Sequence, residues 1–144
     1  MDRPGSDDFL FKDEAFRIRG AVFQVYRAMG AGFLEAVYQE CLALEFDRRA
    51  IAFEALKPLS LNYMGEPLRQ TYVADFVCYG SIIVELKAVR ALAPEHRAQT
   101  INDLRASGKE LGLLVNFGAA PRVEIERFVQ QRRSAPSAFS AVQL

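Results

Sequence analysis

Apolar residues recur along this chain with two different spacings, and glycine and proline residues mark where one spacing gives way to the other. Residues 13–29 and about 33–49 carry apolar side chains three and four positions apart, the spacing of one face of a helix. Gly30-Ala31-Gly32 separates the two segments, and a glycine just beyond the last periodic residue is typical of a helix end. Two helices are therefore predicted at the start of the chain.

The middle of the chain has the shorter spacing of strands. Residues 51–61 alternate between apolar and polar side chains and lead into a turn at residues 62–67. Residues 72–89 contain two runs rich in β-branched and aromatic residues, which meet at Gly80-Ser81. This pattern predicts one strand followed by a β-hairpin.

The last third of the domain begins with Pro94, which favours the first turn of a helix that runs to Ser107 and stops at Gly108. The continuous apolar run of residues 111–117 is typical of a buried parallel strand. Residues 123–129 form a short last element, either strand or helix. This order of elements predicts one layered α/β or α+β fold.

The length of 144 residues suits one domain with a core of its own. We expect residues 1–12 to be disordered, residues 13–131 to form the domain, and residues 132–144 to be a flexible tail rich in Ser, Ala and Pro. No apolar run is long enough to span a bilayer, and the acidic, polar start of the chain is not a secretion signal. Cys41 and Cys78 lack metal-ligand spacing, so reduced thiols in a cytoplasmic protein are expected.

The formal net charge is zero, because 18 basic and 18 acidic side chains balance. Proteins that bind nucleic acid tightly and without regard to sequence usually show a basic surface, so the composition argues against that class. An enzyme that contacts only a few phosphates is compatible with this balance.

The predicted hairpin carries charged residues in an otherwise apolar context. Asp75 interrupts its first strand, while Glu85 and Lys87 stand two positions apart in its second strand and so project from one face. Burying charge is costly unless the charge is paired or binds a metal. Two carboxylates and an ammonium on adjacent strands suit metal-assisted phosphodiester hydrolysis, in which the carboxylates hold Mg²⁺ and the ammonium orients water or stabilises the transition state.

Each of these charged residues also has a purely structural interpretation. Asp75 has Arg69 and Arg90 as candidate ion-pair partners at a sheet edge, and Glu85 with Lys87 is compatible with a simple ion pair. Taken singly, these interpretations are at least as good as a functional site. Taken together they are weaker, because each charged residue of one hairpin then needs its own explanation.

Glu35 is a third candidate acid, three residues after Gly32 and three before Tyr38, so that the three residues are expected to line one stripe. With Gly32 as the N-cap of the second helix, Glu35 occupies the N3 position, where a glutamate commonly reaches back to the cap amide. For Glu35 alone, capping is the favoured interpretation.

The helix predicted after residue 93 carries His96, Gln99 and Asp103 on one face. Gln99 reaches the metal site only if the helix presents this polar edge to it; otherwise the edge is solvated. His96 is the only histidine and there is no Cys/His cluster, which argues against a structural zinc site. The sequence also lacks a serine-hydrolase elbow, a P-loop and a G-x-G-x-x-G motif.

Gly32-x-x-Glu35-x-x-Tyr38 matches the motif of the GxxExxY proteins, small bacterial and archaeal domains of the PD-(D/E)XK nuclease-like superfamily. The sequence resembles this family over about residues 14–129, through Y-V-A-D-F, I-I-V-E-L-K-A-V, H-R-A-Q-T-I-N and L-G-L-L-V-N-F-G. The resemblance implies a three-layer, restriction-endonuclease-like core with a mixed central sheet flanked by helices.

The resemblance also implies roles for individual residues. Asp75, Glu85 and Lys87 match the superfamily's D…ExK signature, and Glu35 matches a first-helix acid that several nucleases of the superfamily add to the metal site. The implied metal ligands are therefore Glu35, Asp75 and Glu85, and the implied cofactor is Mg²⁺ or Mn²⁺. Gln99 completes the implied catalytic set.

Gln99 matches a glutamine that a tyrosine follows four residues later in the RecB-like branch of the superfamily. Here Asp103 takes the place of that tyrosine. This departure puts the phosphate- or DNA-facing role of the helix in doubt, though not the metal site.

The leading hypothesis is a metal-dependent nuclease that acts on nucleic acid, with DNA favoured over RNA. The alternative is a non-catalytic nucleic-acid or protein interaction module on the same scaffold, which the zero net charge and Asp103 favour and the intact D…ExK signature disfavours. A structural ion-pair network without a site is the third interpretation. No membrane association is expected, while residues 123–129 and the apolar first helix leave surface for a homodimer.

Overall fold

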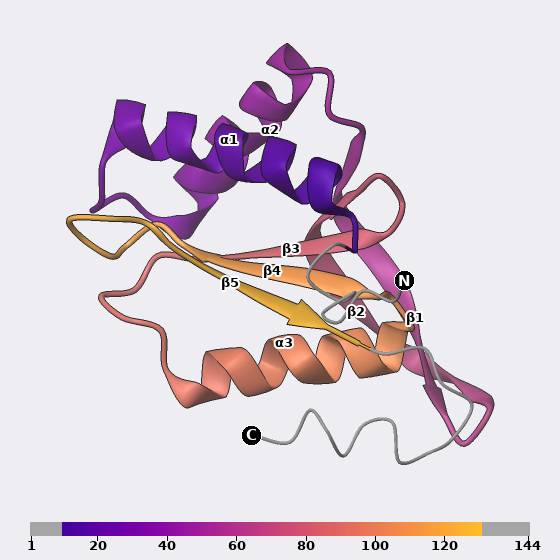
Figure 1. Ribbon diagram of the computed structural model, residues 1–144. Coiled ribbons are helices and arrows are strands. Elements are labelled where there is room, and N and C mark those ends of the chain that lie inside the picture. Colours follow the sequence, from indigo (N-terminus) through magenta and orange to yellow (C-terminus); the bar gives the residue numbers. More distant parts are fainter. Residues whose placement is uncertain (1–9, 131–144) are drawn as a thin grey trace, which may run out of the picture.

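A five-stranded sheet forms the centre of the computed structural model, which describes residues 10–130 (Figure 1). The strands are hydrogen-bonded in chain order, β1-β2-β3-β4-β5, and β3 and β4 run parallel while the other neighbours are antiparallel. Their bounds are β1 Phe53–Tyr63, β2 Glu66–Cys78, β3 Ile82–Lys87, β4 Leu111–Asn116 and β5 Glu124–Val129.

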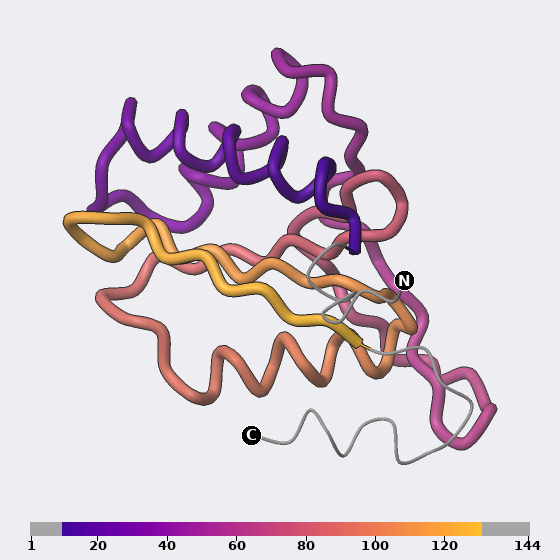
Figure 2. The backbone as a smooth tube through the Cα atoms, viewed as in Figure 1, coloured from indigo at the N-terminus to yellow at the C-terminus, as the bar shows by residue number. Residues whose placement is uncertain are grey.

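Helices cover both faces of this sheet (Figures 1 and 2). Helices α1 (Lys12–Met29) and α2 (Glu35–Arg48) pack together on one face, and α3 (Pro94–Ser107) lies on the other. The expected α+β architecture, with a mixed sheet between two helical layers, is confirmed.

Helix α3 belongs to the connection between the two parallel strands. Parallel neighbours need a crossover of a dozen or more residues, usually a helix, and residues 88–110 supply it. Gly108 ends α3 in the left-handed conformation (φ 76°), at the position that the sequence predicts. All six residues of β4 are buried, so the predicted buried parallel strand is confirmed.

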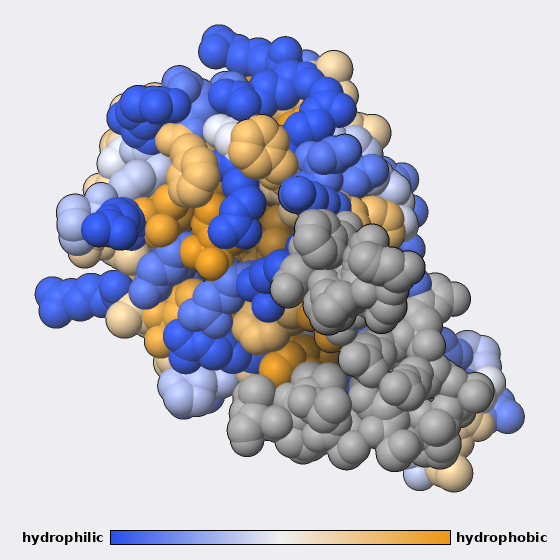
Figure 3. All heavy atoms as spheres, in the orientation of Figure 1, coloured by the Kyte–Doolittle hydropathy of each residue, from blue (hydrophilic) through white to orange (hydrophobic). Residues whose placement is uncertain are grey.

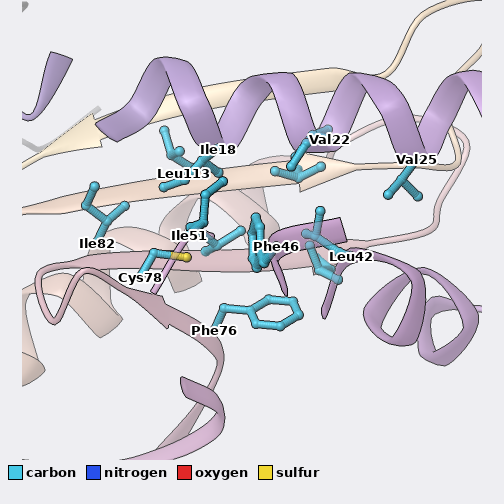
Figure 4. Packing of buried hydrophobic residues seen from close by; sticks show 14 of the residues in the cluster. Ile18, Val22, Val25, Leu42, Phe46, Ile51, Phe76, Cys78, Ile82 and Leu113 are labelled. Carbon is cyan, nitrogen blue, oxygen red and sulfur yellow. The ribbon is translucent and has the colours of Figure 1, made fainter. Parts of the chain in front are cut away.

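The larger core lies between the sheet and the pair α1 and α2. Side chains on one face of α1 point toward α2 and the strands (Figure 4). Phe46 of α2 and Phe76 of β2 meet edge to face, with ring centroids 5.1 Å apart. The residues labelled around them are Ile18, Val22, Val25, Leu42, Ile51, Cys78, Ile82 and Leu113.

The core on the α3 side is smaller. Leu104 of α3 is 2 % exposed and packs against β1, β2 and β3 through Leu59, Ala74, Val77 and Ile83. Gly112 of β4 leaves room for it, since a Cβ at that position would lie 3.3 Å from Leu104 Cδ1. Leu104 therefore anchors α3 to the sheet.

One turn prediction needs correction, and the other is confirmed. The turn expected at residues 62–67 is confined to Met64-Gly65, whereas the turn expected at Gly80-Ser81 is present and also includes Tyr79. Both residues have positive φ in Met64-Gly65 (48° and 85°) and in Tyr79-Gly80 (56° and 69°), as in the tight hairpin turns whose twist matches that of the strands. Strands β1 and β2 therefore run closer to their turn than turn-forming residue types suggest.

The last element, left open between strand and helix, is the strand β5 at the edge of the sheet. All its residues are half-buried. Figure 3 shows hydrophobic residues between α1 and β5, within a mostly hydrophilic described surface.

The disorder expected for residues 1–12 and 132–144 concerns positions that, apart from 10–12, lie outside the described residues. Within the described part, α1 already begins at Lys12. Both cysteines are free thiols, as expected, with Cys78 buried and Cys41 half-buried. Burial raises the pKa of Cys78 to about 12, which makes this thiol unreactive at neutral pH.

Leu104→Ala should lower the free energy of unfolding by about 2–5 kcal/mol, the usual range for removing a buried leucine side chain. Leu44→Ala is the matched control, because Leu44 lies in a helix but is 60 % exposed, and it should change stability by about 0.5 kcal/mol or less. Urea unfolding followed by circular dichroism measures both. Equal effects of the two substitutions would contradict the anchoring role of Leu104.

Candidate active site

The hydrogen-bond ladder between β2 and β3 stops where two of the candidate acids stand. Backbone pairing ends at Phe76 and Val84, and the next opposed positions are Asp75 and Glu85. Beyond these pairs a carboxylate takes the place of a backbone partner: Asp75 Oδ2 accepts a hydrogen bond from the Leu86 N–H at 2.8 Å. The Asp75 N–H lies near enough to the Glu85 carboxylate to lower the pKa of Glu85. Asp75 thus links the two strands where their backbone pairing ends.

Glu85 and Lys87 lie on the α3 side of β3. Ile83, two residues earlier, belongs to the cluster around Leu104, whereas Leu86 belongs to the core beneath α1 and α2. The alternation expected from the sequence is therefore present, and it directs both charged side chains toward α3.

Glu85 has a strongly perturbed carboxyl group. Burial raises its pKa to about 8; the Asp103 and Glu35 charges add to the rise, while Lys87 and the Asp75 N–H oppose it. Its Oε2 atom is buried and has no hydrogen-bond partner among the described residues. An unsatisfied buried carboxylate oxygen is costly, so this position favours a proton or a cation near neutral pH.

Three further carboxyl groups share this environment. Burial raises the pKa values of Glu35, Asp75 and Asp103, and in each case the Lys87 charge acts in the opposite direction. The Lys87 charge therefore acts on four carboxyl groups, counting Glu85. The structure brings four of the five predicted catalytic residues into one electrostatically coupled cluster, together with Asp103.

Glu35 enters this cluster from the start of α2. The helix begins at Glu35, with Leu34 as its N-cap and no side-chain hydrogen bond at the cap. The interpretation with Gly32 as N-cap and Glu35 at N3 is therefore wrong, and Gly32 lies outside the helix rather than on its stripe. Glu35 instead lies within electrostatic range of Asp75.

The loop before α2 is shaped by the other two residues of the Gly-x-x-Glu-x-x-Tyr motif. Gly32 has φ +115°, a conformation that other residues rarely adopt. The buried Tyr38 hydroxyl donates a hydrogen bond to the Gly30 carbonyl and accepts one from the Phe33 N–H at 3.2 Å. Tyr38 thereby closes the loop back on α2 and fixes the place where Glu35 begins the helix.

The end of β4 holds the backbone that follows Lys87. The Phe117 N–H donates to the Lys87 carbonyl at 2.8 Å. The buried Asn116 Oδ1 accepts from the Val89 N–H at 2.9 Å and from the Gly118 N–H at 3.0 Å. The predicted site does not include Asn116 and Gly118. Both lie in the L-G-L-L-V-N-F-G run, but their contact with the Lys87 strand end depends on the parallel pairing of β3 and β4.

Helix α3 presents only part of its polar edge to the cluster. Asp103 is 7 % exposed, and its Oδ1 accepts a hydrogen bond from Gln99 Nε2 at 2.9 Å. Gln99 itself is exposed, so its link to the cluster runs through Asp103. His96 Nδ1 accepts from the Ala93 N–H at 2.9 Å and so caps the start of the helix.

The structural alternatives for the hairpin acids are not realised among the described residues. Asp75 forms no ion pair there with Arg69 or Arg90, and Glu85 forms none with Lys87. Within residues 10–130, no three or more His, Cys, Asp or Glu side chains form a group arranged to hold a metal ion. The carboxyl groups are coupled through charge without forming a complete ligand cage.

Comparison of the structure with solved structures supports the fold. The crystal structure of SSO0001 matches with a TM-score of 0.51 and 18 % sequence identity, over 74 % of this chain and 55 % of that one. This chain therefore spans about half the length of SSO0001, and at this identity the likeness concerns the fold alone.

The sequence identifies the family. Residues 12–128 match the model of the PD-(D/E)XK nuclease superfamily, and the chain belongs to that superfamily. The superfamily assignment expected from the sequence is thus confirmed. A search of curated proteins gives no match. Within the described residues, no helix has the length and apolar character needed to cross a membrane.

In the absence of divalent metal, the free energy of unfolding should fall as the pH rises from about 5 to about 9. The pKa of Glu85 is about 8 in the folded protein, above its ordinary value of 4.5, so between these values the folded state binds more protons than the unfolded state. Glu35, Asp75 and Asp103 shift in the same direction. Glu85→Gln should flatten the dependence, and the exposed Glu40→Gln should leave it unchanged.

Urea unfolding of the wild type and both variants at three pH values measures this dependence. A wild-type slope that Glu85→Gln leaves intact would show that the raised pKa of Glu85 has no effect on stability.

Gly118→Ala should destabilise the fold by about 1–3 kcal/mol, because a Cβ at residue 118 would lie 2.5 Å from Val89 N and 2.7 Å from Ala88 C. Gly65→Ala is a control for backbone strain alone: Gly65 has φ +85° but no atom within 4 Å of the added Cβ. Amide hydrogen exchange should show faster exchange at Val89 in Gly118→Ala than in Gly65→Ala. Unchanged exchange at Val89 would show that the close contact with Gly118 does not hold the backbone that follows Lys87.

Proposed function

We propose that this protein is a metal-dependent nuclease that hydrolyses phosphodiester bonds of nucleic acid at the Asp75–Glu85 strand junction. The observation that carries the proposal is the buried Glu85 Oε2, which has no partner among the described residues although the site contains an excess of carboxyl groups. Membership of the PD-(D/E)XK nuclease superfamily supports the same reaction class.

The residues of the junction fit a hard divalent cation. Mg²⁺ is usually bound through one or two carboxylates, with water and substrate phosphate oxygens completing its octahedral shell, so a complete protein cage is not required. Asp75 and Glu85 would hold Mg²⁺ or Mn²⁺, and Glu35 would add a ligand or act on the attacking water. The Asp103 charge makes ionisation of Glu85 less favourable when no metal ion is bound, so it strengthens the preference of this position for a cation.

When bound, the metal ion supplies Lewis acidity at the scissile phosphate and lowers the pKa of a coordinated water molecule. The side chains supply the rest. The Lys87 ammonium orients the attacking water or stabilises the negative charge that develops on the phosphoryl oxygens. The hydrogen bond from Phe117 to the Lys87 carbonyl fixes the backbone from which that ammonium extends. When substrate is bound, the Gln99 amide would give up its hydrogen bond to Asp103 and contact the phosphate backbone instead.

A non-catalytic interaction module is a second candidate function. The Gln99 amide already donates to Asp103, which occupies the position of the superfamily tyrosine, and the zero net charge of the chain weakens its attraction for nucleic acid. The retained Asp75, Glu85 and Lys87 favour the nuclease.

We further propose DNA as the substrate in preference to RNA, a cytoplasmic location, and a homodimer as an alternative to the monomer.

Isothermal titration calorimetry with Mg²⁺ and with Mn²⁺ tests the metal site. The wild type should bind either ion in the millimolar range or tighter, and Asp75→Asn and Glu85→Gln should each remove that binding because each deletes a charged ligand. Glu40→Gln, which changes the net charge equally at an exposed residue of α2, should retain it. Binding that survives both site substitutions would place the metal elsewhere.

Lys87→Ala should lower the rate of oligonucleotide cleavage by about a hundredfold or more, as expected when one preorganised electrostatic donor is removed. The fold and most of the metal affinity should remain, because Lys87 is not a ligand. Cleavage of a fluorescent oligonucleotide with and without Mg²⁺, beside calorimetry on the same variant, separates the two effects. Full activity in Lys87→Ala would refute the mechanism.

A further inference from the structure

Three loops meet at the end of the sheet where the cluster lies: residues 30–34 before α2, residues 88–93 after β3, and residues 117–123 after β4. They approach one another at the same end of the molecule (Figures 1 and 2). Tyr38, whose hydroxyl bonds to Gly30 and Phe33 of the first loop, stacks on Phe117 of the third, and the Val89 N–H of the second loop donates to Asn116 at the base of the third. These contacts join the three loops, together called the loop surface below.

Two adjacent hydrophobic residues of the loop surface are exposed immediately before Glu35. Phe33 is 46 % exposed and Leu34 is 78 % exposed. The Phe33 ring makes a T-shaped contact with Tyr38, with centroids 6.1 Å apart, and its N–H is held by the Tyr38 hydroxyl. Tyr38 is itself fully buried and stacks on Phe117 at 4.5 Å. Phe33 is therefore an exposed aromatic ring on a firmly anchored backbone.

The charges of the loop surface have one sign. The three loops contain two charged side chains, Arg90 and Arg122, and both are exposed arginines. An exposed aromatic ring and arginines on one surface are a combination by which proteins hold unpaired nucleotides, with a base on the ring and cations near the backbone. Since consecutive Cα atoms are 3.8 Å apart, the Phe33 and Glu35 Cα atoms are at most about 7 Å apart, so a base on Phe33 would lie next to the cluster.

We infer that the loop surface binds single-stranded nucleic acid, with an unpaired base stacked on Phe33 and cations for its phosphates supplied by Arg90 and Arg122. This inference rests on the proposed function and names its substrate class as single-stranded or locally unpaired strands. The exposed ring favours unpaired strands, because in a duplex the faces of the bases are already stacked on one another.

The chain contains no tryptophan, so a single Phe33→Trp substitution introduces the only indole and makes the inference directly measurable. Phe23→Trp is the matched control, since Phe23 is 47 % exposed but lies in the middle of α1. Each full-length variant is titrated in EDTA, to prevent hydrolysis, with a 12-nucleotide single strand and with a blunt hairpin duplex of the same strand length. Tryptophan fluorescence reports stacking, and anisotropy of a labelled oligonucleotide reports binding.

Stacking predicts quenching of Phe33→Trp by the single strand, little quenching by the duplex, and none of Phe23→Trp by either. Phe33→Ala should weaken single-strand binding about tenfold, the effect of losing one base–aromatic contact, and Phe23→Ala should leave it unchanged. Binding seen by anisotropy without quenching at position 33, or equal quenching by duplex, would overturn the inference and leave the proposed nuclease intact. Absence of both binding and metal-dependent cleavage would overturn both.

Discussion

The separation of β2 from β3 at Asp75 and Glu85 is the constraint on which the site depends. Beyond Phe76 and Val84 the backbone ladder stops, and the Asp75 carboxylate accepts a hydrogen bond from the Leu86 N–H of the opposite strand. The backbone pairing can end there without leaving that N–H unpaired. Asp75, and Glu85 opposite it, place negative charge at these half-buried strand positions. The same pair of acids therefore marks the end of the strand pairing and gives the site its affinity for a cation.

A second set of contacts connects α2, on one face of the sheet, with the ends of β3 and β4. Tyr38 closes the loop before Glu35, stacks face to face on Phe117, and so connects α2 with the end of β4. The Phe117 N–H in turn holds the Lys87 carbonyl. Glu35 and Lys87, far apart in sequence, are thereby fixed by neighbouring contacts through Tyr38 and Phe117. These contacts explain a glycine, an acid and a tyrosine at three-residue intervals, because Gly32 and Tyr38 shape the loop that places Glu35. The helical spacing alone suggested instead that the three residues line one stripe.

Local features were predicted best where local interactions decide them. Pro94 and Gly108 bound α3 as expected, because a missing N–H and a left-handed backbone act within one turn of the helix. The turn between β1 and β2 is shorter than predicted, because Met64, a non-glycine residue, adopts positive φ and strand pairing extends to the turn. The capping interpretation of Glu35 failed for a related reason: tertiary contacts of Tyr38 set the start of α2 later than the glycine break suggested.

The order of the elements and the superfamily signature at Asp75, Glu85 and Lys87 can be read from the amino-acid sequence alone. So can the common face of Glu85 and Lys87, since alternation along a strand is a property of the backbone. The place of Asp103 in the cluster and the contacts of Asn116 with the strand end appear only in the folded protein. The same is true of the burial that raises the pKa of Glu85 to about 8. Desolvation and the interaction between charges depend on which groups the packed layers bring together. Glu85 on β3 and Asp103 on α3 influence each other only when α3 packs on the sheet.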